Sequence, residues 1–256
     1  MVTTRTPNLD DLKTADELFA AVMPKRAMVI TAHPDDCEFM CGGTVAVLTK
    51  GGWEVDILVA TSGNKGTKDP RMTSQRLAGL REEEQREAAR RLGAREPIFL
   101  GVHDGGVRDD DELREIIVYQ MRARRPELVI TWDGFRPGFN HRDHRNVGRS
   151  VYDAIYPAAD DHLYHPEHKD EGLEPHRPVV LLLGGQAGTG EPNLVVDIEP
   201  VLRQKVRAVL AHTSQMHGRT EANMLQQWRE QAATRRAEGG AEPVFREAYR
   251  KVIFRR

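Results

Sequence analysis

The chain alternates short apolar runs with longer segments of helical periodicity. The apolar runs have the length of strands and end at polar or Gly-containing turns. They are AMVITA at 27–32, EVDILVATSG at 54–63, PIFLG at 97–101 and ELVITW at 127–132. The helical patterns lie at about 42–50, 74–93, 111–124 and 145–156. This alternation predicts an α/β, Rossmann-like fold: a mostly parallel sheet with helices on both faces.

The remaining sequence begins with a segment, 157–178, that is rich in His, Asp, Glu and Pro and has little periodicity. We expect it to form a long surface loop or flap, because such loops in compact domains are usually functional or disordered. Strands are then predicted at 178–184 and 193–198, and helices at 199–216 and 221–238. We expect one domain over 1–256, a length at the upper end for a single core.

Composition narrows the class of partner. Hydrophobic residues make up 39% of the chain, which contains 37 Lys and Arg residues and 39 Asp and Glu residues. The absence of a positive excess argues against a nucleic-acid partner and against an anionic membrane surface, so a small molecule is favoured. The N-terminus is polar, no apolar run of about 18 residues occurs, and the two cysteines suggest no disulfide framework. We expect a cytoplasmic protein without membrane insertion; the sequence leaves a homo-oligomer open.

The first strand ends in a cluster of polar groups, His33-Pro34-Asp35-Asp36. A turn at this place lets positions i and i+3 converge, so His33 and Asp36 can share one metal while Asp35 points elsewhere. The alternative is a helix-capping cluster, in which Asp35 or Asp36 caps the following helix and His33 is an ordinary loop residue.

A second cluster, at 140–144, follows the strand ELVITW through a Gly- and Pro-containing loop and opens a helix. His141 and His144 are three residues apart and fall on one helical face. With His33 and Asp36, His144 gives three nitrogen or oxygen ligands from two loops at the carboxyl ends of parallel strands. This combination is typical of a catalytic zinc site that keeps one position open for water.

The two clusters also resemble the signatures of a known family. Residues 32–38 read Ala-His-Pro-Asp-Asp-x-Glu, and residues 141–144 read His-x-Asp-His. Both are similar to motifs of the PIG-L or LmbE-like deacetylases, which remove acetyl groups from molecules that contain N-acetylglucosamine. The similarity extends into the C-terminal half through Lys205, His212, Ser214 and Gln215. It therefore covers most of the chain.

This resemblance implies a division of roles. His33, Asp36 and His144 would bind zinc, Asp35 would be the general base, and His141 would act from the opposite side. Amide hydrolysis agrees with this, because zinc lowers the pKa of its water to about 7 and polarises the carbonyl. Asp35 would take the proton of that water, and Asp35 or His141 would protonate the leaving nitrogen. Fe²⁺ suits the same ligands.

Three further residues are candidates for supporting roles. Asp143 would orient the ring of His141 or His144, or else serve as a first-turn acid that interacts with the helix dipole. Arg81 and Asp104 match family positions associated with sugar contacts, and both side chains form directional hydrogen bonds to hydroxyl groups. Arg81 also opens a highly charged helix, in which most residues make only a solvated face.

The sequence does not decide between a functional and a structural role for three further residues. Cys37 is expected to point into the core as a small apolar side chain. Glu38 would either support the site or remain an exposed helix acid. His212 lies on the predicted helix at 199–216, where a lone histidine is more often structural than catalytic.

Three functions compete. The leading one is a zinc-dependent deacetylase acting on an N-acetylglucosamine-containing small molecule. An amidase of thiol conjugates would use the same metal site on a different bond. A non-catalytic α/β binding module belongs to another class, but the first strand leads into HPDDCEFMCGG and not into a Gly-x-Gly-x-x-Gly turn. The usual cradle for a nucleotide pyrophosphate is therefore missing.

Overall fold

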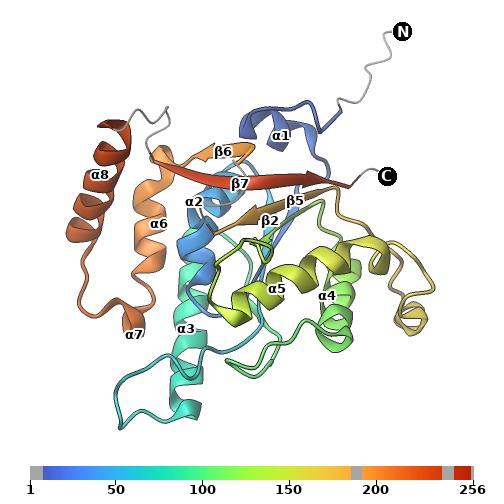
Figure 1. The fold of residues 1–256 in the computed structure, drawn as a ribbon, viewed down its shortest axis with the longest axis horizontal. Helices are drawn as coiled ribbons and strands as arrows, with labels where there is room; N and C mark the ends of the chain where they lie inside the picture. The colour runs from blue at the N-terminus through green and yellow to red at the C-terminus, as the bar shows by residue number, and fades with distance from the viewer. Residues whose placement is uncertain (1–7, 186–191, 238–244, 255–256) are drawn as a thin grey trace.

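The computed structural model describes residues 8–185, 192–237 and 245–254. Its strands join one seven-stranded sheet in the order β3-β2-β1-β4-β5-β7-β6 (Figure 1). β1 to β5 run parallel, and β7 runs antiparallel to both of its neighbours. The strands are β1 (Arg26–Thr31), β2 (Glu54–Val59), β3 (Ile98–Phe99), β4 (Leu128–Trp132), β5 (Val180–Gly184), β6 (Leu194–Asp197) and β7 (Arg246–Ile253). The predicted α/β, mostly parallel architecture is confirmed, whereas a single domain over 1–256 stays a prediction.

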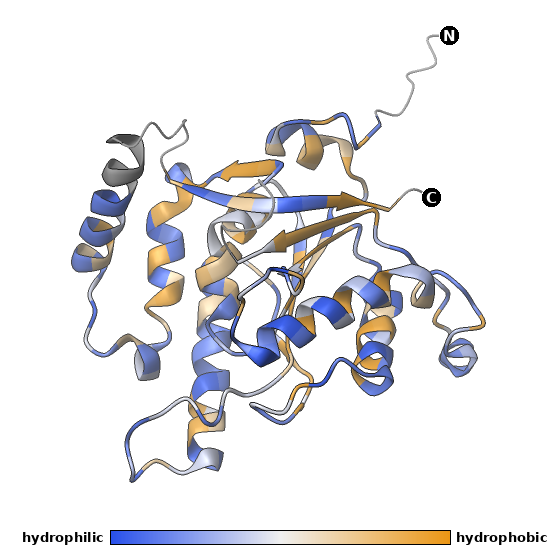
Figure 2. Cartoon of the chain, in the orientation of Figure 1, coloured by the Kyte–Doolittle hydropathy of each residue, from blue (hydrophilic) through white to orange (hydrophobic). Residues whose placement is uncertain are grey.

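Helices cover both faces of this sheet (Figure 1). One face carries α2 (Asp36–Lys50), α3 (Ser74–Leu92) and α6 (Leu202–Val209), with α8 (Glu221–Ala237) outside α6. The other carries α4 (Asp111–Arg124) and α5 (Arg142–Asp153). Neighbouring strand residues serve opposite faces, so Val29 belongs to one buried cluster and Ile30 to the other. β5 and β6 are accordingly coloured mainly as hydrophobic in Figure 2, whereas much of β7 is coloured as hydrophilic.

The strand order places two loops side by side. From β1 the chain moves outward to β2 and β3, then returns to the other side of β1 with β4. At such a reversal the loops that follow the two central strands diverge and leave a crevice at the carboxyl edge of the sheet. The loops after β1 and β4 carry the two polar clusters, so the topology brings them together.

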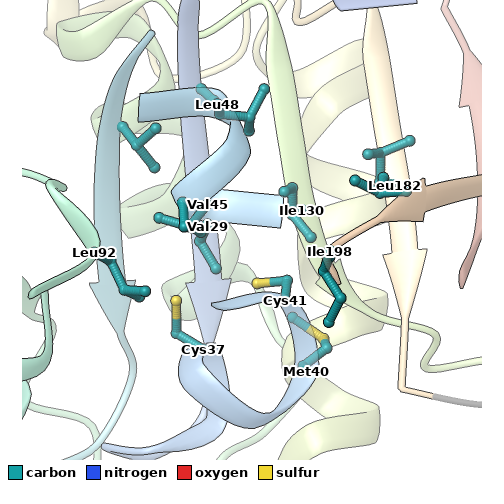
Figure 3. Close-up of a cluster of buried hydrophobic side chains, with 14 of the residues drawn as sticks. Val29, Cys37, Met40, Cys41, Val45, Leu48, Leu92, Ile130, Leu182 and Ile198 are labelled. Carbon is teal, nitrogen blue, oxygen red and sulfur yellow. The ribbon is translucent and has the colours of Figure 1, made fainter. Parts of the chain in front are cut away.

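Helix α2 begins earlier than predicted and is broken. The sequence predicted a helix from Gly42, but α2 begins at Asp36 and has a non-helical residue, Cys41, at φ −141°. The buried side of α2, with Cys37, Val45 and Leu48, packs beside Val29 of β1 and Ile130 of β4 (Figure 3). Cys37 therefore lies in the core as a free thiol, as expected.

A buried ion pair fills the break in α2. Glu247 accepts hydrogen bonds from the N–H groups of Gly43 (2.8 Å) and Thr44 (2.6 Å), which begin the second half of the helix. Lys205 donates to Glu247 (2.5 Å) and to the carbonyl of Phe39 (3.0 Å), which ends the first half. The pair thus satisfies backbone groups that the break leaves without helical partners.

Two other regions differ from the prediction. The helix predicted at 199–216 is divided into a 3₁₀ turn (Glu199–Val201), α6 and a short α7 (Thr213–Met216). At the start of α7, Glu84 of α3 accepts hydrogen bonds from the Thr213 hydroxyl and from the backbone N–H and hydroxyl of Ser214. These bonds stabilise the separation of α7 from α6. Two elements were not predicted: α1 (Ala15–Ala21) and β7. The predicted end of the last helix, at 238, lies outside the described residues.

The segment 157–178 is attached to the body of the protein. It follows a helical turn at Ala154–Ala158 and contains a 3₁₀ helix at Pro166–Glu171. The buried guanidinium of Arg122 on α4 donates to the carbonyls of Ala158 (2.9 Å), Asp161 (3.0 Å) and Tyr164 (2.8 Å). A role as a flap over the site stays a prediction. No helix in the described part of the chain combines the length and apolar character needed to cross a membrane.

Candidate metal centre

The loops after β1 and β4 bring three predicted ligands together. His33 Nδ1 lies 3.2 Å from His144 Nε2, and His144 Nε2 lies 3.1 Å from Asp36 Oδ1. His33 Nδ1 is 3.6 Å from Asp36 Oδ2. Two ligand atoms bound tetrahedrally to one zinc ion at about 2.0–2.1 Å are roughly 3.4 Å apart. The spacing and the chemistry of the three donors therefore fit a bound divalent metal.

The carboxylate of Asp36 is oriented by hydrogen bonds to one of its oxygens. Oδ2 accepts from the backbone N–H groups of Ala32 (3.1 Å) and His33 (2.9 Å) and from the indole N–H of Trp132 (3.3 Å). This leaves Oδ1 directed toward His144. Asp35 is the N-cap residue of α2 but makes no side-chain capping bond. The helix-capping alternative for this cluster is therefore not what the structure shows.

The second nitrogen of His33 faces two carboxylates. Asp143 Oδ2 and Asp104 Oδ1 each lie 3.3 Å from His33 Nε2. A carboxylate at one ring nitrogen holds the proton there and leaves the lone pair of the other nitrogen for a metal. We predicted that Asp143 would orient His141 or His144, but it contacts His33. Asp143 is buried in the first turn of α5 and also accepts from the N–H of Gly105, which fixes it on that side.

The cluster favours positive charge at its centre. Burial lowers the pKa of His33, but hydrogen bonds and charge from Asp104 and Asp36 outweigh it and raise this pKa to about 10. Burial raises the pKa of Asp36, but His144 and His33 bring it far below the ordinary value. Without a metal, a proton on His33 therefore supplies positive charge to these carboxylates. A divalent cation bound at the same place would provide this positive charge instead of the proton.

Stacked rings hold His144. Its imidazole lies between the indole of Trp132, at 4.4 Å and 4° from parallel, and the imidazole of His141, at 4.0 Å and 15°. Among the described residues, the buried Nδ1 of His144 has no hydrogen-bond partner. The usual acceptor behind a metal-bound histidine is thus replaced by two ring contacts. Trp132 was not predicted; its place at the end of the strand ELVITW was the available signal.

His141 lies at the exposed edge of the cluster. It is the N-cap residue of α5, and its ring is 4.9 Å from that of His33. Its pKa is lowered, first by desolvation and then by the charges of His144 and His33. A neutral imidazole is therefore present beside the ligands on the solvent side.

Asp35 is bound by two residues of α3. Its Oδ2 accepts from Arg81 at 3.0 Å, and its backbone N–H donates to Gln85 at 3.0 Å. Burial, followed by the charge of Asp36, raises the pKa of Asp35 to about 6, although Arg81 opposes the shift. A carboxyl group with this pKa is suited to take up and return a proton near neutral pH.

Arg81 and Asp104 are both buried next to the site. Arg81 donates to the carbonyls of Pro34 and Gly63 and to Asp35, so it ties the loop after β2 to the loop after β1. Asp104 accepts from the backbone N–H of Lys65 at 2.8 Å and faces His33. In this structure both side chains support the cluster. Sugar contacts by either one stay a prediction.

Glu38 and His212 form a buried pair behind Asp35. Glu38 Oε2 lies 3.1 Å from His212 Nε2, and Glu38 Oε1 accepts from Gln85 at 2.9 Å. Glu38 is therefore neither an exposed acid nor a direct neighbour of the ligand atoms. Gln85 was also not predicted, because a glutamine within the charged helix at 74–93 gives no signal of a buried role.

Comparisons with known proteins agree with this site. The family model described as "PIG-L: GlcNAc-PI de-N-acetylase" matches residues 28–155. The chain is 33% identical to the diacetylchitobiose deacetylase of Thermococcus kodakarensis, over 80% of each chain. It is 27% identical to the 1D-myo-inositol 2-acetamido-2-deoxy-α-D-glucopyranoside deacetylase of Actinosynnema mirum, over 75% of this chain and 81% of that one. The N,N'-diacetylchitobiose deacetylase of Pyrococcus horikoshii, solved with an inhibitor, superposes with a TM-score of 0.81 at 26% identity, covering 96% of this chain and 88% of that one.

The chain belongs to the PIG-L family, as the resemblance of its two motifs predicted. It is accordingly a hydrolytic enzyme, an N-deacetylase, and not a non-catalytic binding module.

Proposed function

We propose that this protein is a zinc-dependent deacetylase that removes the N-acetyl group of a small molecule containing N-acetylglucosamine. The observation that carries the proposal is the convergence of His33, Asp36 and His144, in which His144 Nε2 lies 3.2 Å from His33 Nδ1 and 3.1 Å from Asp36 Oδ1, next to the partly buried Asp35. Relatives that act on diacetylchitobiose and on an N-acetylglucosaminyl inositol support the substrate class.

The residues divide the chemistry as follows. When bound, zinc polarises the amide carbonyl and makes a water molecule more acidic. One oxygen of Asp35 is engaged by Arg81, and no residue in the described part of the chain hydrogen-bonds to its Oδ1. Oδ1 is thus available to accept the proton of the attacking water. Asp35 then passes that proton to the leaving nitrogen; alternatively, a protonated His141 at the exposed edge donates its own proton to the nitrogen, and Asp35 releases the proton from the water to solvent.

The amino-sugar substrate is tested by measuring acetate and free amine. The panel is N-acetylglucosamine, N,N'-diacetylchitobiose and the N-acetylglucosaminyl inositol, each offered to protein freed of metal and reloaded with zinc. We expect equal amounts of acetate and amine from at least one compound. Cleavage of larger thiol-conjugate amides with no acetate from any amino sugar would instead establish the amidase.

The identity of the metal is tested in the same preparation. Two histidines and one carboxylate also form a donor set used by Fe²⁺. Zinc reloading should restore deacetylation under air. Restoration by Fe²⁺ alone, under anaerobic conditions, would contradict the assignment of zinc.

A further inference from the structure

The backbone of Asp35 is strained. Its φ is +92°, in the left-handed region that favours glycine. A non-glycine residue in such a region is strained, and the conformation persists only where its surroundings fix it. Two residues of α3, one helical turn apart, supply this restraint: Arg81 binds the carboxylate, and Gln85 accepts the backbone N–H at 3.0 Å.

The amide of Gln85 is itself oriented by a buried pair. Its Nε2 donates to Glu38 Oε1 at 2.9 Å, and Glu38 Oε2 meets His212 Nε2 at 3.1 Å. Gln85, Glu38 and His212 are each 0% exposed. A carboxylate accepts hydrogen bonds and cannot donate them, so Glu38 requires the NH₂ group of Gln85. The amide oxygen must then face Asp35, and the glutamine has only one orientation.

We propose that Gln85 is a positioning residue for Asp35. Held by the Glu38–His212 pair, its amide oxygen fixes the peptide of Asp35 in the left-handed conformation that presents the carboxylate to the reacting centre. The inference rests on the proposed function, in which Asp35 transfers the proton. Gln85 touches neither the metal ligands nor any atom that reacts, so it acts only through Asp35.

Exchanging the side chains of Glu38 and Gln85 tests this arrangement. In Gln85→Glu a second carboxylate faces Glu38 and the donor between them is lost. In the double variant Glu38→Gln, Gln85→Glu the amide and the carboxylate trade places. The residue at 85 still accepts from Asp35, and the residue at 38 now donates to it while accepting from His212.

We expect Gln85→Glu to lower kcat by about 10- to 100-fold, with KM and zinc content close to those of the parent, and to lower the midpoint of thermal unfolding because two carboxylates then face each other in a buried site. The double variant should recover most of this loss. Gln120→Glu on α4, whose side chain makes no hydrogen bond among the described residues, is the matched control and should leave kcat unchanged. If the single variant keeps full kcat, or if the folded, zinc-loaded double variant is no better than the single one, the proposal is overturned.

A second measurement does not depend on activity. Hydrogen exchange of the Asp35 amide should become at least tenfold faster in Gln85→Met, while the amides of β1 stay protected. Unchanged exchange at Asp35 would also overturn the role of Gln85. If the parent releases no acetate from any amino sugar, the proposed function fails, yet the exchange result still decides whether Gln85 holds Asp35.

Discussion

Trp132 and His144 stack face to face, with ring centroids 4.4 Å apart and ring planes 4° from parallel. The same indole donates its N–H to Asp36. One side chain at the end of β4 therefore contacts two predicted metal ligands that come from different loops. It therefore links the loop after β1 to the loop after β4.

Substitution of Trp132 should weaken metal binding in two steps. Trp132→Phe keeps an aromatic face against His144 but loses the donor to Asp36, whereas Trp132→Leu loses both contacts. We expect zinc affinity to fall about 10- to 100-fold in the Leu variant and less in the Phe variant. Competition with a chromogenic chelator measures this, with Trp228→Phe on α8 as the control. A Leu variant that binds zinc as tightly as the parent would contradict the role of the stack.

Removal of a ligand should remove the metal. His144→Ala deletes one of three donors, so purified protein should contain far less than one zinc per chain and release no measurable acetate. His162→Ala changes an exposed histidine outside the cluster and should keep both properties. Elemental analysis gives the zinc content. Full zinc occupancy in His144→Ala would show that other groups hold the ion.

Replacement of Asp35 should separate proton transfer from metal binding. Asp35→Asn keeps the size of the side chain and loses the base, so kcat should fall about 10²- to 10⁴-fold while zinc content stays near that of the parent. Steady-state kinetics with elemental analysis of the same sample checks both expectations. An active Asn variant would refute the assignment of Asp35 as the base.

Two glycines in helices should respond to alanine in opposite ways. A Cβ at Gly43 would lie 2.5 Å from Ile198 Cγ2 and 2.7 Å from its Cβ, so Gly43→Ala should destabilise the fold by about 1–3 kcal/mol. At Gly79 on α3 nothing lies within 4 Å, so Gly79→Ala should stabilise it by about 1 kcal/mol. Urea unfolding compares the two. Equal effects at both positions would argue against close packing of α2 at Gly43.

The buried ion pair behind α2 should be needed for stability. Lys205→Met leaves the carboxylate of Glu247 buried without its cation, and we expect a loss of about 3–5 kcal/mol in the free energy of unfolding. Lys68→Met, at an exposed lysine with no hydrogen bond or ion pair among the described residues, should change it by less than about 0.5 kcal/mol. Chemical denaturation measures both. A Lys205→Met protein as stable as the parent would show that the ion pair between Lys205 and Glu247 is not needed for stability.

The sequence anticipated what depends on local pattern. Parallel strands appear in the sequence as apolar runs because both of their faces are buried. The predicted metal ligands lie in the loops that follow two of these runs. The break in α2 was missed because its cause, Glu247, lies about 200 positions away. β7 was missed because its sequence, REAYRKVI, does not alternate polar and apolar residues, although the strand presents Glu247 and Tyr249 to the interior. Asp143 was assigned to its neighbours in sequence, whereas its partner, His33, lies in the loop after β1.

The placement of β7 sets the order in which the protein can mature. This strand is the last of the seven to be synthesised, yet it lies between β5 and β6 and delivers Glu247 to the break in α2. Domains begin to fold from the N-terminus while synthesis continues. His33 to Glu38 therefore emerge from the ribosome about 200 residues before Glu247, which bonds to the second half of the helix that follows them. The helix beside the predicted ligands can thus take the form described here only after β7 has been made.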